Sequence, residues 1–339
     1  MHSHPPAQQI PMPVNARARE TSTRQRRIAL TVLVLQNTLL VLMMRQSRST
    51  CKPDQALYNP ATAVFLSEVL KTIFCFATVR YKRLGGAVSW NSSWRNEVTQ
   101  MLIPSALYAV QNNLLYIALS NLEAATFQIT YQLKILSTAI FSVILLNRKI
   151  TRKNWIALIL LMLGVTLVQT QTATTDVASS SSNDKPLLGL VAVLACCVSS
   201  GFAGCYFEKS LKTSDTSMWV RNIQLGLCSL VFSAAGLLVN DWALLRSNGF
   251  FYGYNGLVWL VICNQAAGGL IVASVVKYAD SILKAFATSI SILLSSCISY
   301  YLFDFRVTWT FALGAAIVLY ATYLYGKPEQ VTISSGKYL

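Results

Sequence analysis

The sequence predicts an all-α integral membrane protein with ten transmembrane helices in two inverted five-helix repeats. Composition gives the first indication, because 54% of the 339 residues are apolar, only 12% are charged and the mean hydropathy is +0.47. A soluble domain of this length is less apolar. The second indication is a series of ten apolar runs, each close in length to the roughly 20 residues that a helix needs to cross a bilayer. The third is a buried lysine, Lys134, that recurs 150 positions later as Lys284.

The first expected helix covers 28–44 and follows a basic stretch, 1–27, that contains five arginines. No clear small-residue cleavage site follows this apolar run, so we interpret the run as a retained helix and 1–27 as a disordered cytosolic tail. The remaining expected helices cover 60–79, 102–119, 123–147, 154–171, 187–207, 218–239, 254–272, 274–302 and 308–325. Lys277 and Asp280 fit either a loop or the first turns of the ninth helix. The 150-residue offset aligns Ser274 with the start of the fourth helix and favours the helix.

The polar segment 172–186, with its TATT and SSSS runs, divides the chain into halves at 28–171 and 187–326. Such a composition is typical of a flexible linker. Each half holds five spans, and because five is odd, a second copy must insert upside down. Lys and Arg concentrate on the side of the two tails, 1–27 and 327–339, which predicts that both termini are cytosolic and the linker lumenal.

The distribution of charged and reactive residues excludes several classes of protein. The net charge of +15 lies in short clusters between apolar runs, so nucleic acid is not an expected partner. Only His2 and His4 are histidines, which excludes a histidine-based site within the membrane. The eight cysteines form no CxxC pair and are interpreted as free thiols rather than metal or redox groups. No phosphate-binding GxxxxGK[ST] loop is present, which excludes a primary pump. We predict no cofactor.

Lys134 is the only charge in the 23-residue run 124–146. A lysine at this depth costs about 2.5–3.5 kcal/mol, so it normally faces a polar cavity or a counter-charge. The offset that superposes it on Lys284 also superposes Thr138 on Thr288 and Gly164 on Gly314. A buried cation repeated with its neighbours suggests a duplicated fold that binds an anion at its centre.

Polar and aromatic residues at helical spacing indicate what that anion is. One face of the fourth helix carries Phe127, Tyr131, Lys134 and Thr138, and the expected ninth helix carries Lys277, Ser281, Lys284 and Thr288, continued by Ser291 and Ser295. The third helix adds the amides of Gln111, Asn112 and Asn113. Lysines suit phosphate oxygens, aromatic faces suit a flat base, and amides both donate and accept. These residues predict a ligand with a base, phosphates and hydroxyls.

Each of these features also has a purely structural explanation. Lys134 could pair with a carboxylate from another helix, and Lys277 and Lys284 could snorkel or pair with Asp280. The serines of the ninth helix could only join helices. Glu68 and Lys71, three residues apart on the second helix, are expected to pair with each other, and such a pair could also act in gating.

Four segments resemble the nucleotide-sugar transporters of the Golgi, over about residues 28–326. They are YAVQNNLLYIALSNLEAATFQITYQLKILSTAIFS (108–142), GFAGCYFEKSLK (201–212), WVRNIQLG (219–226) and NQAAGGLIVASVVKYADSILKAFATSIS (264–291). The resemblance implies the drug/metabolite transporter fold and exchange of a cytosolic nucleotide sugar for a lumenal nucleoside monophosphate. It also implies roles in nucleotide binding for Asn112, Lys134, Asn222 and Lys284, with Phe127 and Tyr131 near the base and Glu68–Lys71 as a pair typical of the second helix.

Within that family the motifs are most similar to the UDP-galactose type. Carriers of CMP-sialic acid tend to have tyrosine where this chain has Phe127 and Gly226, which argues against that branch. UDP-N-acetylglucosamine remains an alternative substrate. The expected ligands are therefore a UDP-sugar and UMP, in a Golgi bilayer, with a homodimer as one assembly to test.

Two other classes of function fit less well. A membrane enzyme would need carboxylates or histidines at the membrane face, and Glu68 is the only carboxylate expected deep in a span. A scaffold or receptor that transports nothing has no use for lysines at the membrane midplane.

Overall fold

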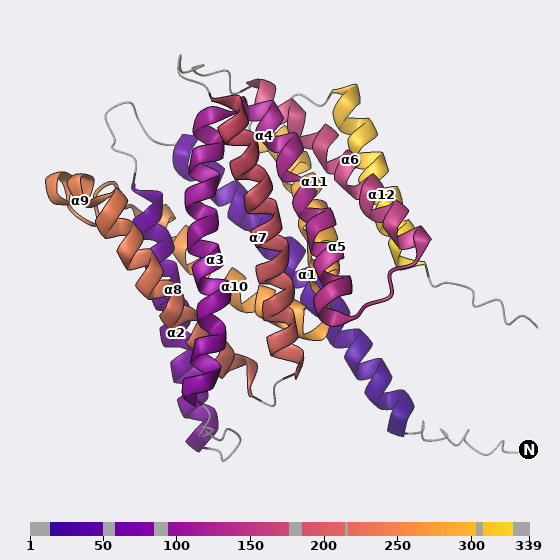
Figure 1. Ribbon diagram of the computed structural model, residues 1–339, viewed down its shortest axis with the longest axis horizontal. Coiled ribbons are helices and arrows are strands. Elements are labelled where there is room, and N and C mark those ends of the chain that lie inside the picture. Colours follow the sequence, from indigo (N-terminus) through magenta and orange to yellow (C-terminus); the bar gives the residue numbers. More distant parts are fainter. Residues whose placement is uncertain are drawn as a thin grey trace, which may run out of the picture.

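The computed structural model describes residues 14–49, 58–84, 94–175, 185–213, 216–302 and 308–327, and within these ranges all regular structure is α-helical (Figure 1). The helices are α1 Val14–Ser49, α2 Pro60–Leu84, α3 Trp94–Asn121, α4 Ala124–Tyr131, α5 Leu133–Leu146, α6 Arg152–Thr175, α7 Pro186–Thr213, α8 Met218–Asn240, α9 Trp242–Asn248, α10 Gly256–Tyr278, α11 Ser281–Leu302 and α12 Trp309–Gly326.

Ten segments among the described residues are long and apolar enough to cross a membrane. They coincide with the ten spans expected from hydropathy, so the all-α, ten-helix fold class is confirmed. α1 begins at Val14, within the stretch expected to be a tail, and the short α9 was not foreseen. Residues 1–13, 176–184 and 328–339, which include most of the expected tails and linker, lie outside the described residues.

The fourth span is not the single helix that was expected. It is divided at Gln132 into α4 and α5. There the amide N–H of Gln132 donates to the carbonyl of Ile129, and the N–H of Ile135 donates to the carbonyl of Gln132, at 3.2 and 3.0 Å. These three-residue hydrogen bonds tighten one turn and interrupt the α-helical ladder. Tyr131 and Lys134 consequently lie on two separate helices.

The expected boundary between the eighth and ninth spans was wrong. Lys277 lies in the last turn of α10, and α11 begins only at Ser281, after a break at Ala279 and Asp280. Asp280 caps α11. Its side-chain Oδ1 accepts a hydrogen bond from the backbone N–H of Leu283 at 2.7 Å, and its carbonyl oxygen accepts one from the backbone N–H of Lys284 at 3.0 Å. Aspartate is a preferred N-cap residue, so this local signal was stronger than the repeat offset.

Two groups of closely packed helices can be distinguished within the bundle. α7 packs along α3 and α5, while α1 packs along α10 and α11. We call these the α3–α5–α7 unit, which also includes α4, and the α1–α10–α11 unit. α2 packs against α8, and α6 against α12, which lie side by side at one edge of Figure 1.

Gly164 of α6 and Gly314 of α12, equivalent under the 150-residue offset, lie against each other. A Cβ on Gly164 would be 3.0 Å from the carbonyl oxygen of Gly314, and one on Gly314 would be 2.8 Å from that of Gly164. A two-fold relation between halves would bring equivalent positions together in this way. The inverted orientation of the repeats remains a prediction.

Candidate functional site

A cavity of about 350 Å³ lies between the α3–α5–α7 unit and the α1–α10–α11 unit. Residues of α2, α6 and α8 complete its wall. The volume is within the usual range for small-molecule sites, about 300–1,000 Å³. The cavity therefore lies at the boundary between these two groups of helices.

Three lysines line this cavity, namely Lys71, Lys134 and Lys284. Lys71 is paired, since its Nζ lies 2.6 Å from both carboxylate oxygens of Glu68. In the described part of the chain, neither Lys134 nor Lys284 has a carboxylate within ion-pair distance. A structural ion pair for Lys134 is therefore not found there. The two repeated lysines give the cavity a positive charge that a bound anion would neutralise.

Lys71 was expected only as half of a pair on the second helix. The structure confirms the pair and brings Lys71, whose side chain is 7% exposed, into the cavity wall. Gly269 on α10 makes this reach feasible, because a Cβ there would be 2.8 Å from the Lys71 Cδ. A role of Glu68 and Lys71 in gating remains a prediction.

Aromatic rings of the same membrane span pack next to Lys134. The Nζ of Lys134 lies 3.8 Å from the centroid of the Tyr131 ring, a cation–π contact. Phe127 stacks on Tyr131 with centroids 5.4 Å apart and is itself buried. Phe127 thus packs behind Tyr131 instead of lining the cavity. Two further aromatic side chains, Tyr108 and Phe207, were not expected and do line it.

Amides and hydroxyls complete the wall. Asn222 and Thr288, both expected site residues, line the cavity, and each donates to a carbonyl of its own helix, at 2.8 and 2.9 Å. Gln132 and Gln169, which sequence reasoning missed, also line it and hydrogen-bond to each other. No pattern in the sequence indicates this pair, because the helix break at Gln132 is seen only in the structure.

Three expected site residues lie elsewhere. Asn113 is exposed and donates to the carbonyl of Ala109 on its own helix at 3.1 Å. Lys277 belongs to α10, so it does not share a helix face with Lys284 and is not part of the cavity wall. Thr138 donates to the Lys134 carbonyl at 2.8 Å and is not among the residues that line the cavity. The Asn112 side chain lies outside the described residues.

The serines of α11 divide between the two expected roles. Ser281 lines the cavity. Ser291 instead accepts a hydrogen bond from Asn37 of α1 at 2.7 Å, so it joins helices. Ser295 is buried and donates within its own helix.

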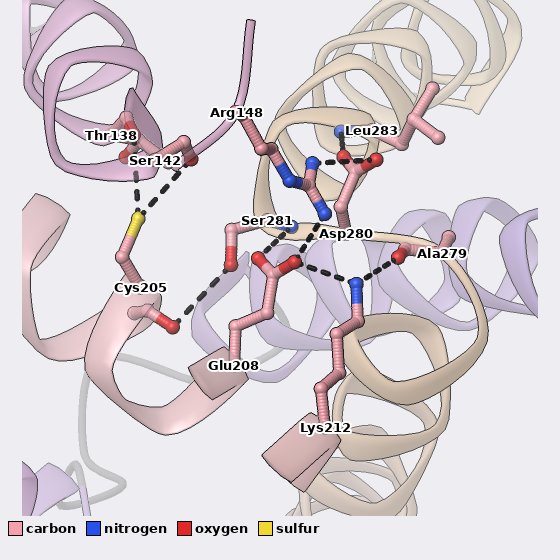
Figure 2. Close-up of polar contacts among 11 residues, drawn as sticks. Thr138, Ser142, Arg148, Cys205, Glu208, Lys212, Ala279, Asp280, Ser281 and Leu283 are labelled. Carbon is pink, nitrogen blue, oxygen red and sulfur yellow. Dashed lines mark hydrogen bonds and ion pairs between the residues drawn. The ribbon is translucent and has the colours of Figure 1, made fainter. Parts of the chain in front are cut away.

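A second polar cluster, formed by Arg148, Glu208, Lys212 and Asp280, was also missed (Figure 2). Glu208 is fully buried near the C-terminal end of α7, so Glu68 is not the only carboxylate within a membrane span. The expected sixth helix ended at residue 207, whereas α7 continues to Thr213 and so includes Glu208 and Lys212. The spacing of Glu208 and Lys212, four residues apart on a helix, was the signal that could have revealed an ion pair.

Nothing in the described residues indicates a metal site, since they contain no group of three or more His, Cys, Asp or Glu that could hold an ion. Seven cysteines are free thiols, and Cys51 lies outside the described residues, as do His2 and His4.

A ten-span helical bundle that surrounds a cationic cavity has the construction of a membrane carrier for a small anionic molecule. Sequence comparison makes the class specific. The profile of the nucleotide-sugar transporter family matches residues 21–326, and this chain belongs to that family. It is therefore a transporter and not an enzyme.

The chain is similar to several curated proteins over nearly its whole length. A UDP-N-acetylglucosamine transporter of Canis lupus familiaris is 48% identical, covering 92% of this chain and 98% of its own. A UDP-N-acetylglucosamine/UDP-N-acetylgalactosamine transporter of Caenorhabditis elegans is 45% identical (93% and 97%), and a UDP-galactose transporter of Schizosaccharomyces pombe is 44% identical (92% and 91%). A crystal structure with 13% identity has the same fold, with a TM-score of 0.64 over 88% of this chain and 95% of its own.

Proposed function

We propose that this protein is a Golgi antiporter that carries a UDP-sugar from the cytosol into the lumen and returns UMP. The observation that carries the proposal is the meeting of Lys134 and Lys284 in one cavity without carboxylate partners among the described residues. Unpaired buried cations are unfavourable, and a diphosphate bound between them would compensate their charge. Both termini would face the cytosol, as the distribution of Lys and Arg indicates.

The cavity wall also suits the nucleoside. Tyr108, Tyr131 and Phe207 offer aromatic surface for the flat base. The amides of Asn222, Gln132 and Gln169 can donate and accept, which a uracil edge or sugar hydroxyl requires. UMP would share the base and one phosphate with the UDP-sugar, so the same site would accept both ligands in turn.

Exchange is expected from the packing of the helices. One central cavity between two units is the arrangement in which rocking of the units exposes the site to each side alternately. If the loaded carrier reorients faster than the empty one, import of a UDP-sugar requires return of UMP.

Two observations favour different sugars as the transported group. The motifs of the chain are most similar to the UDP-galactose type, which makes UDP-galactose the first candidate. UDP-N-acetylglucosamine is the second candidate, because relatives named for it are 48% identical. Both sugars share the UDP group that the lysines would hold.

Purified protein in liposomes tests these proposals together. Vesicles loaded with UMP should take up labelled UDP-galactose or UDP-N-acetylglucosamine, and their uptake should exceed that of empty vesicles. CMP-sialic acid should enter poorly. Vesicles with Lys134→Met protein serve as the matched control. Equal uptake into empty and UMP-loaded vesicles would contradict exchange, and preferred uptake of CMP-sialic acid would contradict a uridine ligand.

A further inference from the structure

The polar cluster of Figure 2 lies at the end of the bundle where α1 begins, which we call the N-terminal side. Arg148 follows Asn147, whose left-handed backbone (φ 51°) ends α5. The guanidinium of Arg148 lies 2.6 Å from Glu208 Oε1 and 3.0 Å from Asp280 Oδ2. Lys212 Nζ lies 2.7 Å from the same Glu208 oxygen. Two cations and two carboxylates therefore balance within one cluster.

Three contacts of this cluster connect the two packing units. Arg148 reaches Asp280, the N–H of Ser281 donates to Glu208 Oε2 at 2.8 Å, and Lys212 donates to the carbonyl of Ala279 at 2.7 Å. In each contact one partner belongs to the α3–α5–α7 unit or the loop after α5. The other is Ala279 or Asp280, in the break between α10 and α11, or Ser281, the first residue of α11. Separation of the units at this end must therefore break all three contacts.

The cluster also adjoins the cavity directly. Ser281, which donates to Glu208, is a cavity-lining residue, and Phe207, the residue before Glu208, is another. Glu208 itself has no exposed surface. The cluster thus lies directly beside the cavity wall on the N-terminal side.

Opening would leave no carboxylate of the cluster without a partner. Glu208 would keep Arg148 and Lys212, which belong to its own side of the gap, and Asp280 would keep the Leu283 N–H that it caps. Burial lowers the pKa of Arg148, but Asp280 and Glu208 raise it by more, so the net pKa is raised and the residue is charged at neutral pH. Each carboxylate therefore keeps a hydrogen-bond partner after separation, and Arg148–Asp280 is the one ion pair that is lost, which favours reversible opening and closing.

We propose that Arg148, Glu208, Lys212 and Asp280 form the gate that closes the substrate cavity on its N-terminal side. This proposal rests on the proposed function, since a gate has meaning only in a carrier with alternating access. Glu208 acts here as a positioning residue that holds the start of α11 against α7, and the Arg148–Asp280 pair is the contact that must release to admit ligand.

The test measures access to the cavity from the N-terminal side. Ala285, which lines the cavity one turn beyond Ser281, is changed to cysteine as a reporter. Sealed vesicles from expressing cells receive a membrane-impermeant maleimide, and labelling is quantified on the peptide that contains residue 285. Protease sensitivity of an N-terminal tag identifies the side that the reagent reaches. Asp280→Asn keeps the capping oxygen and removes only the charge that binds Arg148.

Asp280→Asn should raise labelling from the N-terminal side about tenfold, the equilibrium change expected from loss of one charge-assisted contact. Arg148→Gln should raise labelling by a similar factor, and it provides the test if Asp280→Asn folds poorly. Lys149→Ala, which removes an exposed neighbouring cation outside the cluster, is the matched control and should leave labelling unchanged.

Affinity for UMP, measured on each purified variant, separates the two proposals. Both gate variants should bind UMP like the parent, since the altered charges lie behind the cavity wall. Absence of UMP binding in the parent protein would overturn the proposed function without involving the gate. Unchanged labelling in both gate variants with intact UMP binding would overturn the gate, as would an equal rise in Lys149→Ala.

Discussion

Replacement of Lys134 or Lys284 by methionine tests the binding site most directly. Methionine keeps the length of the side chain and removes its charge, and an uncharged residue is easier to insert into a membrane. Both lysines line the cavity, on α5 and α11 respectively. If each contacts a phosphate, each loss removes one charge-assisted contact worth about 1.5–3 kcal/mol. Affinity for UMP should then fall roughly ten- to 150-fold in either variant.

The assay is UMP binding to purified protein in detergent, normalised to the fraction that is folded. Lys277→Met is the matched control, because Lys277 lies in α10 away from the cavity wall, and this variant should bind UMP like the parent. A scaffold would show no change in any variant, and snorkelling of Lys284 would confine the effect to Lys134. Losses below about threefold in both Lys134→Met and Lys284→Met would refute the placement of the nucleotide site.

Three further predictions concern stability and topology. Gly201→Ala should lower the melting temperature, since the new Cβ would be 2.3 Å from Ser137 Oγ and 2.7 Å from the Ser137 carbonyl carbon. Such overpacking destabilises by about 1–3 kcal/mol. Gly204→Ala is the control and should leave the melting temperature unchanged, because a Cβ there would meet no atom within 4 Å. Glu68→Gln should destabilise by about 3–5 kcal/mol by leaving Lys71 unpaired, and adding Lys71→Met should restore the melting temperature; no recovery would contradict the pairing argument. Asn91, in the only N-x-S/T sequon, should stay unglycosylated because its loop is expected to be cytosolic; a glycosidase-sensitive mass shift that disappears in Asn91→Gln would reverse the topology.

The sequence was sufficient for those features that depend on the bilayer as a solvent. A span needs about 20 apolar residues, so the number of spans can be read from hydropathy. A lysine in such a run is costly, so Lys134 and Lys284 stood out without any knowledge of contacts. Helical spacing likewise placed Glu68 near Lys71, because neighbours on a helix are determined by sequence separation. It also placed Tyr131 near Lys134, and this contact is kept although a tight turn divides the span between them.

Only the tertiary structure decided which of these side chains meet across helices. The turn at Gln132 and the cap at Asp280 interrupt helices that the sequence predicts as continuous, and Gln132 contacts Gln169 whereas Lys277 and Lys284 lie on different helices. Arg148, Glu208 and Asp280 lie far apart in the sequence, and their contacts depend on how α7 packs against α5 and on where α10 ends. Such contacts follow from the packing of whole helices, and no local pattern of residues encodes them.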